Sequence, residues 1–268
     1  MTATTPSSRG GRWLAALTDE APALPGYPDS VRVVDGELDG APARYIAVVP
    51  DPASDFPRAR GGEVGLVEGW TLARAVRETM AADVDGPRRP IVAVIDVPSQ
   101  AYGRTEEAFG IHQALAAAAD AYAAARRAEH PVIGLIVGKA MSGAFLAHGY
   151  QANRLIALDD AAVEVHAMGK QAAARITQRT VEGVEALART ITPMAYDIRS
   201  FQRLGLLHRL LSVADADSPA GPDVAAVRDA LTEACRDIGD SRDLGARLGE
   251  GRAASLAVRR RLRAQWQS

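Results

Sequence analysis

The chain has 268 residues, of which 47% are hydrophobic, enough to bury one large core. Its 31 basic and 33 acidic side chains leave a formal net charge of -2, which offers no electrostatic attraction for nucleic acid or a membrane surface. Cys235 is the single cysteine, so an internal disulfide and a cysteine-rich metal site are excluded. No run reaches the roughly 18 apolar residues that a spanning helix needs. We expect a cytoplasmic protein with one main domain and neither a nucleic-acid nor a membrane partner.

The N-terminal third is predicted to hold a tail, a short helix, a hairpin and a longer helix. Residues 1–10 have the composition of a flexible tail, and residues 13–17 could form a short helix. Two β-branched runs, 31–34 and 44–49, are separated by Asp-Gly pairs, the turn chemistry of a hairpin. Apolar residues then recur at helical spacing over residues 65–82. This order predicts a hairpin at the start of the main domain.

The middle of the chain alternates strands and helices. Residues 91–97 and 132–137 are continuous apolar runs, typical of strands covered on both faces. An alanine-rich helix is predicted between them, at residues 105–129. Two short strands are expected at 154–158 and 162–165. The pattern predicts an α/β fold with a parallel sheet flanked by helices.

The C-terminal part is predicted to be helical. The main domain is assigned to residues 11–213, and the polar stretch 214–222, with its prolines and glycine, is predicted to be a linker. Residues 223–268 then form a C-terminal helical segment, whose Arg-rich end packs on the core or on a partner.

Two turns follow the two central strands, so both should lie at the same edge of a parallel sheet. The first spans residues 96–103, and the second, rich in small residues, spans 138–144. Free N–H groups at a helix start favour negative charge, and two such loops could direct peptide N–H groups at one oxygen. That geometry would stabilise an enolate. Small residues in such a turn equally serve tight packing.

Both turns carry a family resemblance. Residues 96–107 and 137–144 resemble the alpha side of acyl-CoA carboxyltransferases, members of the crotonase superfamily with an Asp-x-Pro-Gly loop, an acidic pair and a glycine-rich turn. This sequence departs from that pattern at Ser99 and Gln100, where the family has glycines. The departures, together with residues 163–170, are similar to the gamma subunit of biotin-independent malonate decarboxylase, over roughly residues 30 to 213.

The resemblance implies a crotonase-like fold and a subunit of a decarboxylase. With a homologous beta subunit, such a chain decarboxylates a malonyl thioester on an acyl carrier protein, through an enolate and without a metal. The carrier's arm is expected to be a phosphoribosyl-dephospho-coenzyme A group, and this chain binds no cofactor directly. By position, the backbone N–H groups of Gly143 and Ala144 are the candidate oxyanion donors, and Ser99 and Gln100 supply the opposing loop.

Four further side chains are candidates for binding the substrate: Tyr102, Lys139, Ser142 and His166. His166 could donate to a carboxylate, since an imidazole titrates near neutral pH, or it could be a buried structural histidine. Lys139 could attract the malonyl carboxylate or simply be solvated. Tyr102 could line the pocket or cover the turn.

Two other functions fit the same residues. The chain could be the alpha-like subunit of a biotin-dependent carboxyltransferase, although its first loop departs from that pattern. It could also be a noncatalytic scaffold for the beta subunit, with both turns vestigial.

Overall fold

The computed structural model describes residues 8–247 and 252–267. Most of the tail predicted at residues 1–10 lies outside these ranges. Its last residues do not belong to a tail, because helix α1 (Arg9–Leu17) begins at Arg9 with the Ser8 hydroxyl accepting from the Gly11 N–H. The predicted start of this helix at residue 13 is therefore wrong by one turn.

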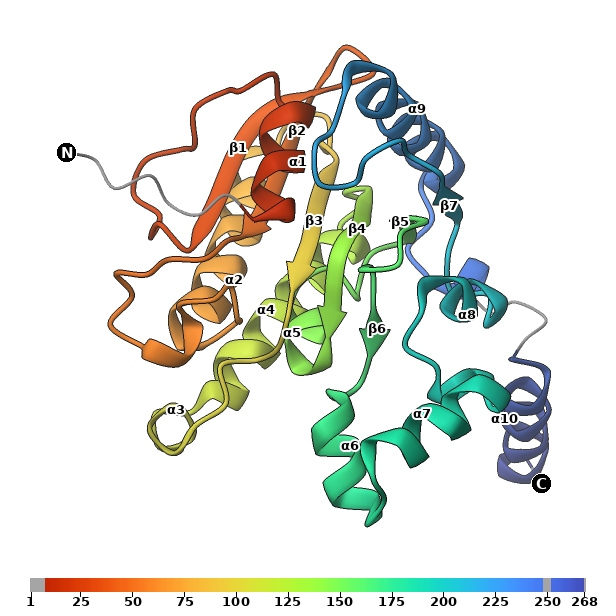
Figure 1. Ribbon diagram of the computed structural model, residues 1–268. Helices are drawn as coiled ribbons and strands as arrows, with labels where there is room; N and C mark the ends of the chain where they lie inside the picture. Colours follow the sequence, from red (N-terminus) through yellow and green to blue (C-terminus); the bar gives the residue numbers. More distant parts are fainter. Residues whose placement is uncertain (1–7, 248–251, 268) are drawn as a thin grey trace.

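Within the described residues, seven strands form one sheet in the order β1-β2-β3-β4-β5-β7, with β6 paired to β4 (Figure 1). The first two strands form the predicted antiparallel hairpin, and every other pairing is parallel, as the alternation of strands and helices predicts. The strands are β1 (Val31–Leu38), β2 (Ala41–Val48), β3 (Ile91–Val97), β4 (Val132–Met141), β5 (Arg154–Leu158), β6 (Val165–His166) and β7 (Arg209–Leu211).

Helices cover both faces of this sheet, which explains why β3 and β4 are apolar along their length (Figure 1). Helices α1 and α9 (Gly221–Ile238) pack together on one face, and α2 (Leu66–Ala82) and α4 (Ile111–Arg127) pack together on the other. The last two approach closely at Gly69, where a Cβ would meet the Ala114 backbone at 2.8 Å. A glycine is needed there for the two helices to touch.

Three predicted boundaries differ in the structure. The helix predicted at 105–129 is two helices, α3 (Arg104–Ala108) and α4, because Gly110 adopts a left-handed φ of 83° between them. The second central strand continues to Met141, so most of the predicted turn at 138–144 is strand. The strand predicted at 162–165 is reduced to the two residues of β6.

Short elements gather beyond the carboxyl ends of the strands. Helices α6 and α7 lie next to each other there (Figure 1). They share a small apolar cluster that includes Met141 and Tyr196. The helices in this region are α5 (Ser142–Ala147), α6 (Lys170–Thr177), α7 (Val181–Thr190) and α8 (Ile198–Arg203), with 3-10 turns at Pro57–Ala59, Thr192–Met194 and Gly245–Arg247.

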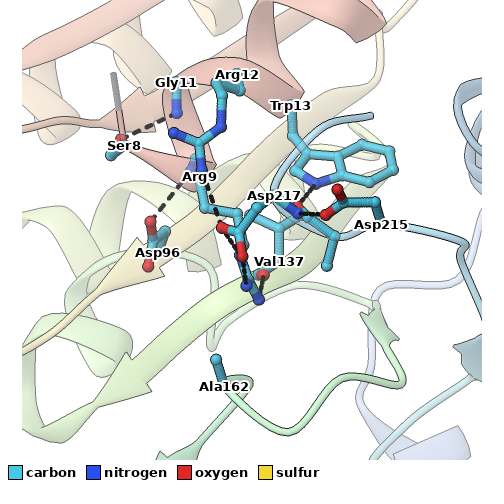
Figure 2. A network of polar contacts seen from close by, with 12 residues as sticks. Ser8, Arg9, Gly11, Arg12, Trp13, Asp96, Val137, Ala162, Asp215 and Asp217 are labelled. Atoms are coloured by element: carbon cyan, nitrogen blue, oxygen red, sulfur yellow. Dashed lines mark hydrogen bonds and ion pairs between the residues drawn. The ribbon is translucent and has the colours of Figure 1, made fainter. Parts of the chain in front are cut away.

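The stretch predicted as a linker, residues 214–222, packs on the core instead. Its Ala216 is buried, and the Ala216 carbonyl accepts from the Trp13 indole N–H at 2.8 Å (Figure 2). Helix α9 starts at Gly221 and contacts β1, β4, β5 and β7. The first C-terminal helix is therefore part of the main domain. Helix α10 (Ala253–Trp266) buries none of its residues. No helix in the described ranges is long and apolar enough to cross a membrane.

Candidate active site

The structure brings the two predicted turns into contact. The Gly143 N–H, in the first turn of α5, donates to the Gln100 side-chain oxygen at 2.7 Å. The first loop is itself fixed by an isolated bridge to Val64, whose N–H donates to the Ser99 carbonyl and whose carbonyl accepts from the Ala101 N–H. The loops after β3 and β4 thus meet at the carboxyl edge of the sheet, where parallel strands place ligands.

This contact changes the interpretation of Gly143. The N–H expected to be a free oxyanion donor already has an acceptor, because glutamine stands where the carboxyltransferase pattern has a glycine and its amide reaches across. Ala144 is completely buried, and the Ser99 hydroxyl donates to the Gln100 carbonyl at 2.8 Å. In this conformation the Gly143 N–H is not free to donate to another oxygen.

The aspartate of the first motif has a structural role. The Asp96 carboxylate, near the end of β3, accepts N–H bonds from Lys139 and Gly10, both at 3.1 Å. A Cβ at Gly138 would lie 2.1 Å from this carboxylate, so only glycine fits there. Asp96 therefore joins β3 to β4 and to α1 directly beside the site.

Ser142 starts helix α5 in a strained conformation, with a φ of 64° that side chains rarely adopt. Such outliers persist where surrounding structure enforces them, and they gather at functional sites. Here β4 is pinned to β6 through Met141 up to the residue before the turn. The chain then reverses sharply into α5, which places the Ser142 side chain at the edge of a pocket.

That pocket has a volume of about 370 Å³ and lies between α5, β6 and α8. It contains three of the residues predicted from the sequence, Ser142, Gly143 and His166. The rest of its wall is almost entirely apolar, and it is formed by Phe145, Leu146, Tyr150, Val165, Ala167, Pro193, Ala195, Phe201 and Leu204. We call it the apolar pocket.

His166 is held in a fixed orientation in this wall. Its ring stacks on Tyr196 with centroids 3.9 Å apart and an interplanar angle of 14°, and its Nδ1 lies 2.9 Å from the Met168 carbonyl oxygen. Burial lowers the pKa of His166 below its usual value, so the imidazole is neutral at pH 7. A neutral imidazole can donate or accept a hydrogen bond without adding charge to the pocket.

The other two candidates for binding the substrate, Lys139 and Tyr102, lie outside the apolar pocket. The exposed Lys139 lines a separate pocket of about 320 Å³, together with Lys170 and Tyr196. Tyr102 is 60% exposed, and a hydrogen bond to Glu107 raises its pKa. Neither side chain shares a wall with Ser142 and His166.

Sequence reasoning missed the aromatic part of the pocket. Phe145 packs edge-on against Tyr150 and Phe201, with centroids 5.1 and 6.4 Å away. The chain has only four phenylalanines, and two of them line this one pocket, which was the available signal. His148 is completely buried between Tyr122 and the Val94 carbonyl, away from this pocket's wall. Among the described residues, no group of three His, Cys, Asp or Glu side chains is placed to hold a metal ion.

The sheet order and the paired loops define an α/β protein with a crotonase-like fold. A chain of transcarboxylase 12S shares this fold, with a TM-score of 0.61 and 19% identity, over 85% of this chain and 41% of that one. The family model of the malonate decarboxylase gamma subunit matches residues 59–266. The chain therefore belongs to the malonate decarboxylase gamma subunit family.

Solved structures agree with this assignment. The chain is 63% identical to a chain of a Pseudomonas malonate decarboxylase hetero-tetramer in complex with coenzyme A, with a TM-score of 0.94, over 97% of this chain and 100% of that one. A chain of the Pseudomonas MdcD-MdcE hetero-dimer is 62% identical, with a TM-score of 0.90 and the same coverage.

A curated relative has a different reaction in its name. The malonyl-S-ACP:biotin-protein carboxyltransferase of Malonomonas rubra is 35% identical over 164 residues, which are 60% of this chain and 56% of that protein. The match thus spans little more than half the length of this relative.

Proposed function

We propose that this chain and a homologous beta subunit together decarboxylate a malonyl thioester on an acyl carrier protein, in the cytoplasm. The products are an acetyl thioester and carbon dioxide. The carrier presents the malonyl group on a phosphoribosyl-dephospho-coenzyme A arm, and neither a metal nor biotin takes part. Family membership and the likeness to chains of decarboxylase assemblies support this proposal.

The apolar pocket is the observation that carries the chemistry. Losing carbon dioxide converts a carboxylate into a neutral molecule and leaves an enolate on the thioester. An apolar wall disfavours the carboxylate relative to carbon dioxide, because burying a charge is costly. Ser142 and the neutral His166 can orient the carboxylate by hydrogen bonds before it leaves.

The two subunits then divide the work. The Gly143 N–H is bonded to Gln100, so this chain offers no free donor there for the enolate oxygen. We assign stabilisation of that oxygen mainly to the beta subunit, through preorganised N–H donors. This chain supplies the facing wall of the cleft, with the Gln100–Gly143 contact holding the two loops in place.

Turnover by separated and combined subunits tests this division. We expect no carbon dioxide release from malonyl carrier protein with the purified chain alone, and robust release once the beta subunit is added. Substitution of Ser142 or His166 by alanine should lower turnover of the assembled complex. Robust turnover by the isolated chain, or full turnover in both alanine variants, would contradict the proposal.

A biotin-dependent reaction is the second candidate, because the curated relative transfers a carboxyl group to a biotin protein, as its name states. Avidin separates the two functions. We expect avidin to leave decarboxylation by the pure complex unchanged. Inhibition by avidin that added biotin reverses would establish the biotin-dependent alternative.

A further inference from the structure

A second, strongly basic pocket adjoins the apolar pocket. It has a volume of about 310 Å³ and shares Tyr150 with the apolar pocket, so the two sites are neighbours. Three arginines line it, Arg247, Arg252 and Arg259, while the remaining wall is two leucines and a glycine. We call it the arginine pocket.

Arg247 is fixed in the wall of the arginine pocket. It is only 6% exposed, and its Nη1 donates to the Tyr150 and Ala152 carbonyls at 2.6 and 3.1 Å. The guanidinium lies over the Tyr150 ring, 4.6 Å from the centroid. The Tyr150 side chain gives this guanidinium a further hydrogen bond. A guanidinium that is held in one orientation beside a pocket suits an external oxyanion.

The absence of a carboxylate partner sets Arg247 apart from comparable residues. Two other arginines are equally buried, and each pairs with an aspartate: Arg44 with Asp35 at 2.6 Å, and Arg154 with Asp237 at 2.5 Å. No carboxylate in residues 8–247 or 252–267 pairs with Arg247. Burying an unpaired cation is costly, and the cost is offset when a ligand supplies the negative charge.

The two other arginines add to the same positive field. Arg252 and Arg259 stand at the start and in the second turn of α10, and no ion pair involves either of them among the described residues. Burial, with Arg252 nearby, lowers the pKa of Arg247, as expected where positive charges crowd together. Three guanidinium groups around one space exceed what a single carboxylate needs, and they match a phosphate or pyrophosphate group.

We propose that the arginine pocket binds the phosphate groups of a nucleotide-type thioester carrier, while the apolar pocket across Tyr150 takes the thioester end of the same molecule. The source of that phosphate, the arm of the acyl carrier protein, rests on the proposed function above. The shared chemistry is a phosphate ester or diphosphate, whether free or attached to a protein.

Calorimetric titration of the assembled complex with 3′-dephospho-coenzyme A tests the pocket without turnover. The double variant Arg252→Gln, Arg259→Gln removes one half-buried and one exposed charge and leaves the buried Arg247 in place. We expect it to weaken binding by on the order of tenfold or more, because charge-assisted hydrogen bonds are lost. The matched control Arg261→Gln, on the same helix but outside the pocket, should change affinity by less than about twofold.

Pantetheine, which has no phosphate, should bind equally to wild type and double variant. Equal affinity of both proteins for 3′-dephospho-coenzyme A, or no binding by wild type, would overturn the proposal.

Carrier protein with and without its arm distinguishes a phosphate on the arm from a charge on the carrier's own surface. The double variant should weaken binding of the carrier that bears the arm and leave binding of the carrier without it unchanged. Equal weakening for the armless carrier would assign the arginines to an acidic protein surface instead. A failure of the proposed function would appear separately, as wild-type complex that binds the coenzyme but releases no carbon dioxide.

Discussion

The Gly143 N–H, which the sequence pattern predicts to be a free donor, is bonded to the Gln100 side chain. A glycine in the first loop would leave the Gly143 N–H unpaired, whereas the glutamine reaches it at 2.7 Å. The same hydrogen bond sets the separation of the two loops, since each is otherwise attached to a different strand. Any side chain added at residue 143 must therefore move Gln100.

Gly143→Val should lower decarboxylation by the assembled complex about 10²-fold or more. The new Cβ would start 3.0 Å from the Gln100 amide oxygen and 3.3 Å from Leu115, which pushes the first loop away from α5. Misplacing reacting groups by about 1 Å can cost a factor of that size. Turnover, complex mass and melting temperature should be measured on one preparation.

Gly183→Val is the matched control. Gly183 also lies in the first turn of a helix and donates its N–H to a side-chain oxygen, that of Thr180, but it lines no pocket near the site. We expect the control to keep turnover within about twofold. Normal turnover in correctly assembled Gly143→Val complex would remove this residue from the site, and loss of assembly alone would give it a packing role only.

His148 makes the stability of the fold depend on pH. Complete burial lowers its pKa from 6.5 to about 4, so the unfolded chain binds this proton more readily than the folded one. The stability is therefore complete above the unfolded pKa and is lost as pH falls from 6.5 towards 4. This one group should remove about 2 kcal/mol of unfolding free energy between pH 7 and pH 4.5.

Urea unfolding of wild type and His148→Gln at both pH values measures this contribution. Glutamine does not titrate, yet it can still bond to Tyr122 and the Val94 carbonyl. We expect the wild type to lose about 2 kcal/mol more than the variant on acidification. Equal losses would show that other groups carry the pH dependence.

Secondary structure could be predicted where a local pattern decides it, and not where distant contacts do. The hairpin and the two central strands follow from β-branched runs and Asp-Gly turns. The extension of β4 to Met141 could not be predicted, because it depends on pairing with β6, more than twenty residues later. The proximity of Ser142 to His166 could not be predicted either, because it results from the same pairing of β4 with β6. The break between α3 and α4 at the left-handed Gly110 could have been predicted, because glycine often ends a helix, but the long alanine-rich run favoured one continuous helix.

Gly110→Ala should destabilise the fold by about 1 kcal/mol, because a φ of 83° strains any residue with a Cβ. The substitution meets no steric obstacle beyond ordinary contact with Gln113, so the cost comes from the backbone alone. Gly86→Ala is the control, at a loop glycine with an ordinary φ and open surroundings. In denaturant unfolding, the unfolding free energy of Gly110→Ala should therefore be about 1 kcal/mol lower than that of Gly86→Ala. Equal stability of both would mean that α3 and α4 can fuse into one helix.

At the scale of the whole molecule, a network of polar contacts joins α1 to the sheet and to the stretch before α9 (Figure 2). Arg9, with a side chain only 9% exposed, bonds to Asp217 at 2.6 Å and to Asp160 at 2.7 Å. It also donates to the Val137 carbonyl in β4 at 3.2 Å. The contacts join α1, the sheet and the stretch before α9, so this stretch cannot separate from the sheet without breaking them.

Arg9→Ala should therefore lower the unfolding free energy by about 2–3 kcal/mol, the scale of losing several charge-assisted hydrogen bonds at one partly enclosed site. Arg236→Ala is the control, since that arginine is 69% exposed and its pair with Asp39 should contribute less than about 1 kcal/mol.

The Arg9 guanidinium holds the pKa values of Asp160 and Asp217 below their usual value of 3.8. Their contribution is thus complete above pH 3.8 and is lost as pH falls through the lowered values, so the gap between wild type and Arg9→Ala should narrow in strong acid. Denaturant unfolding at pH 7 and pH 3 measures both effects. A gap as small as that of Arg236→Ala at pH 7 would show that the apolar contacts of α1, not this ion-pair network, hold the two ends together.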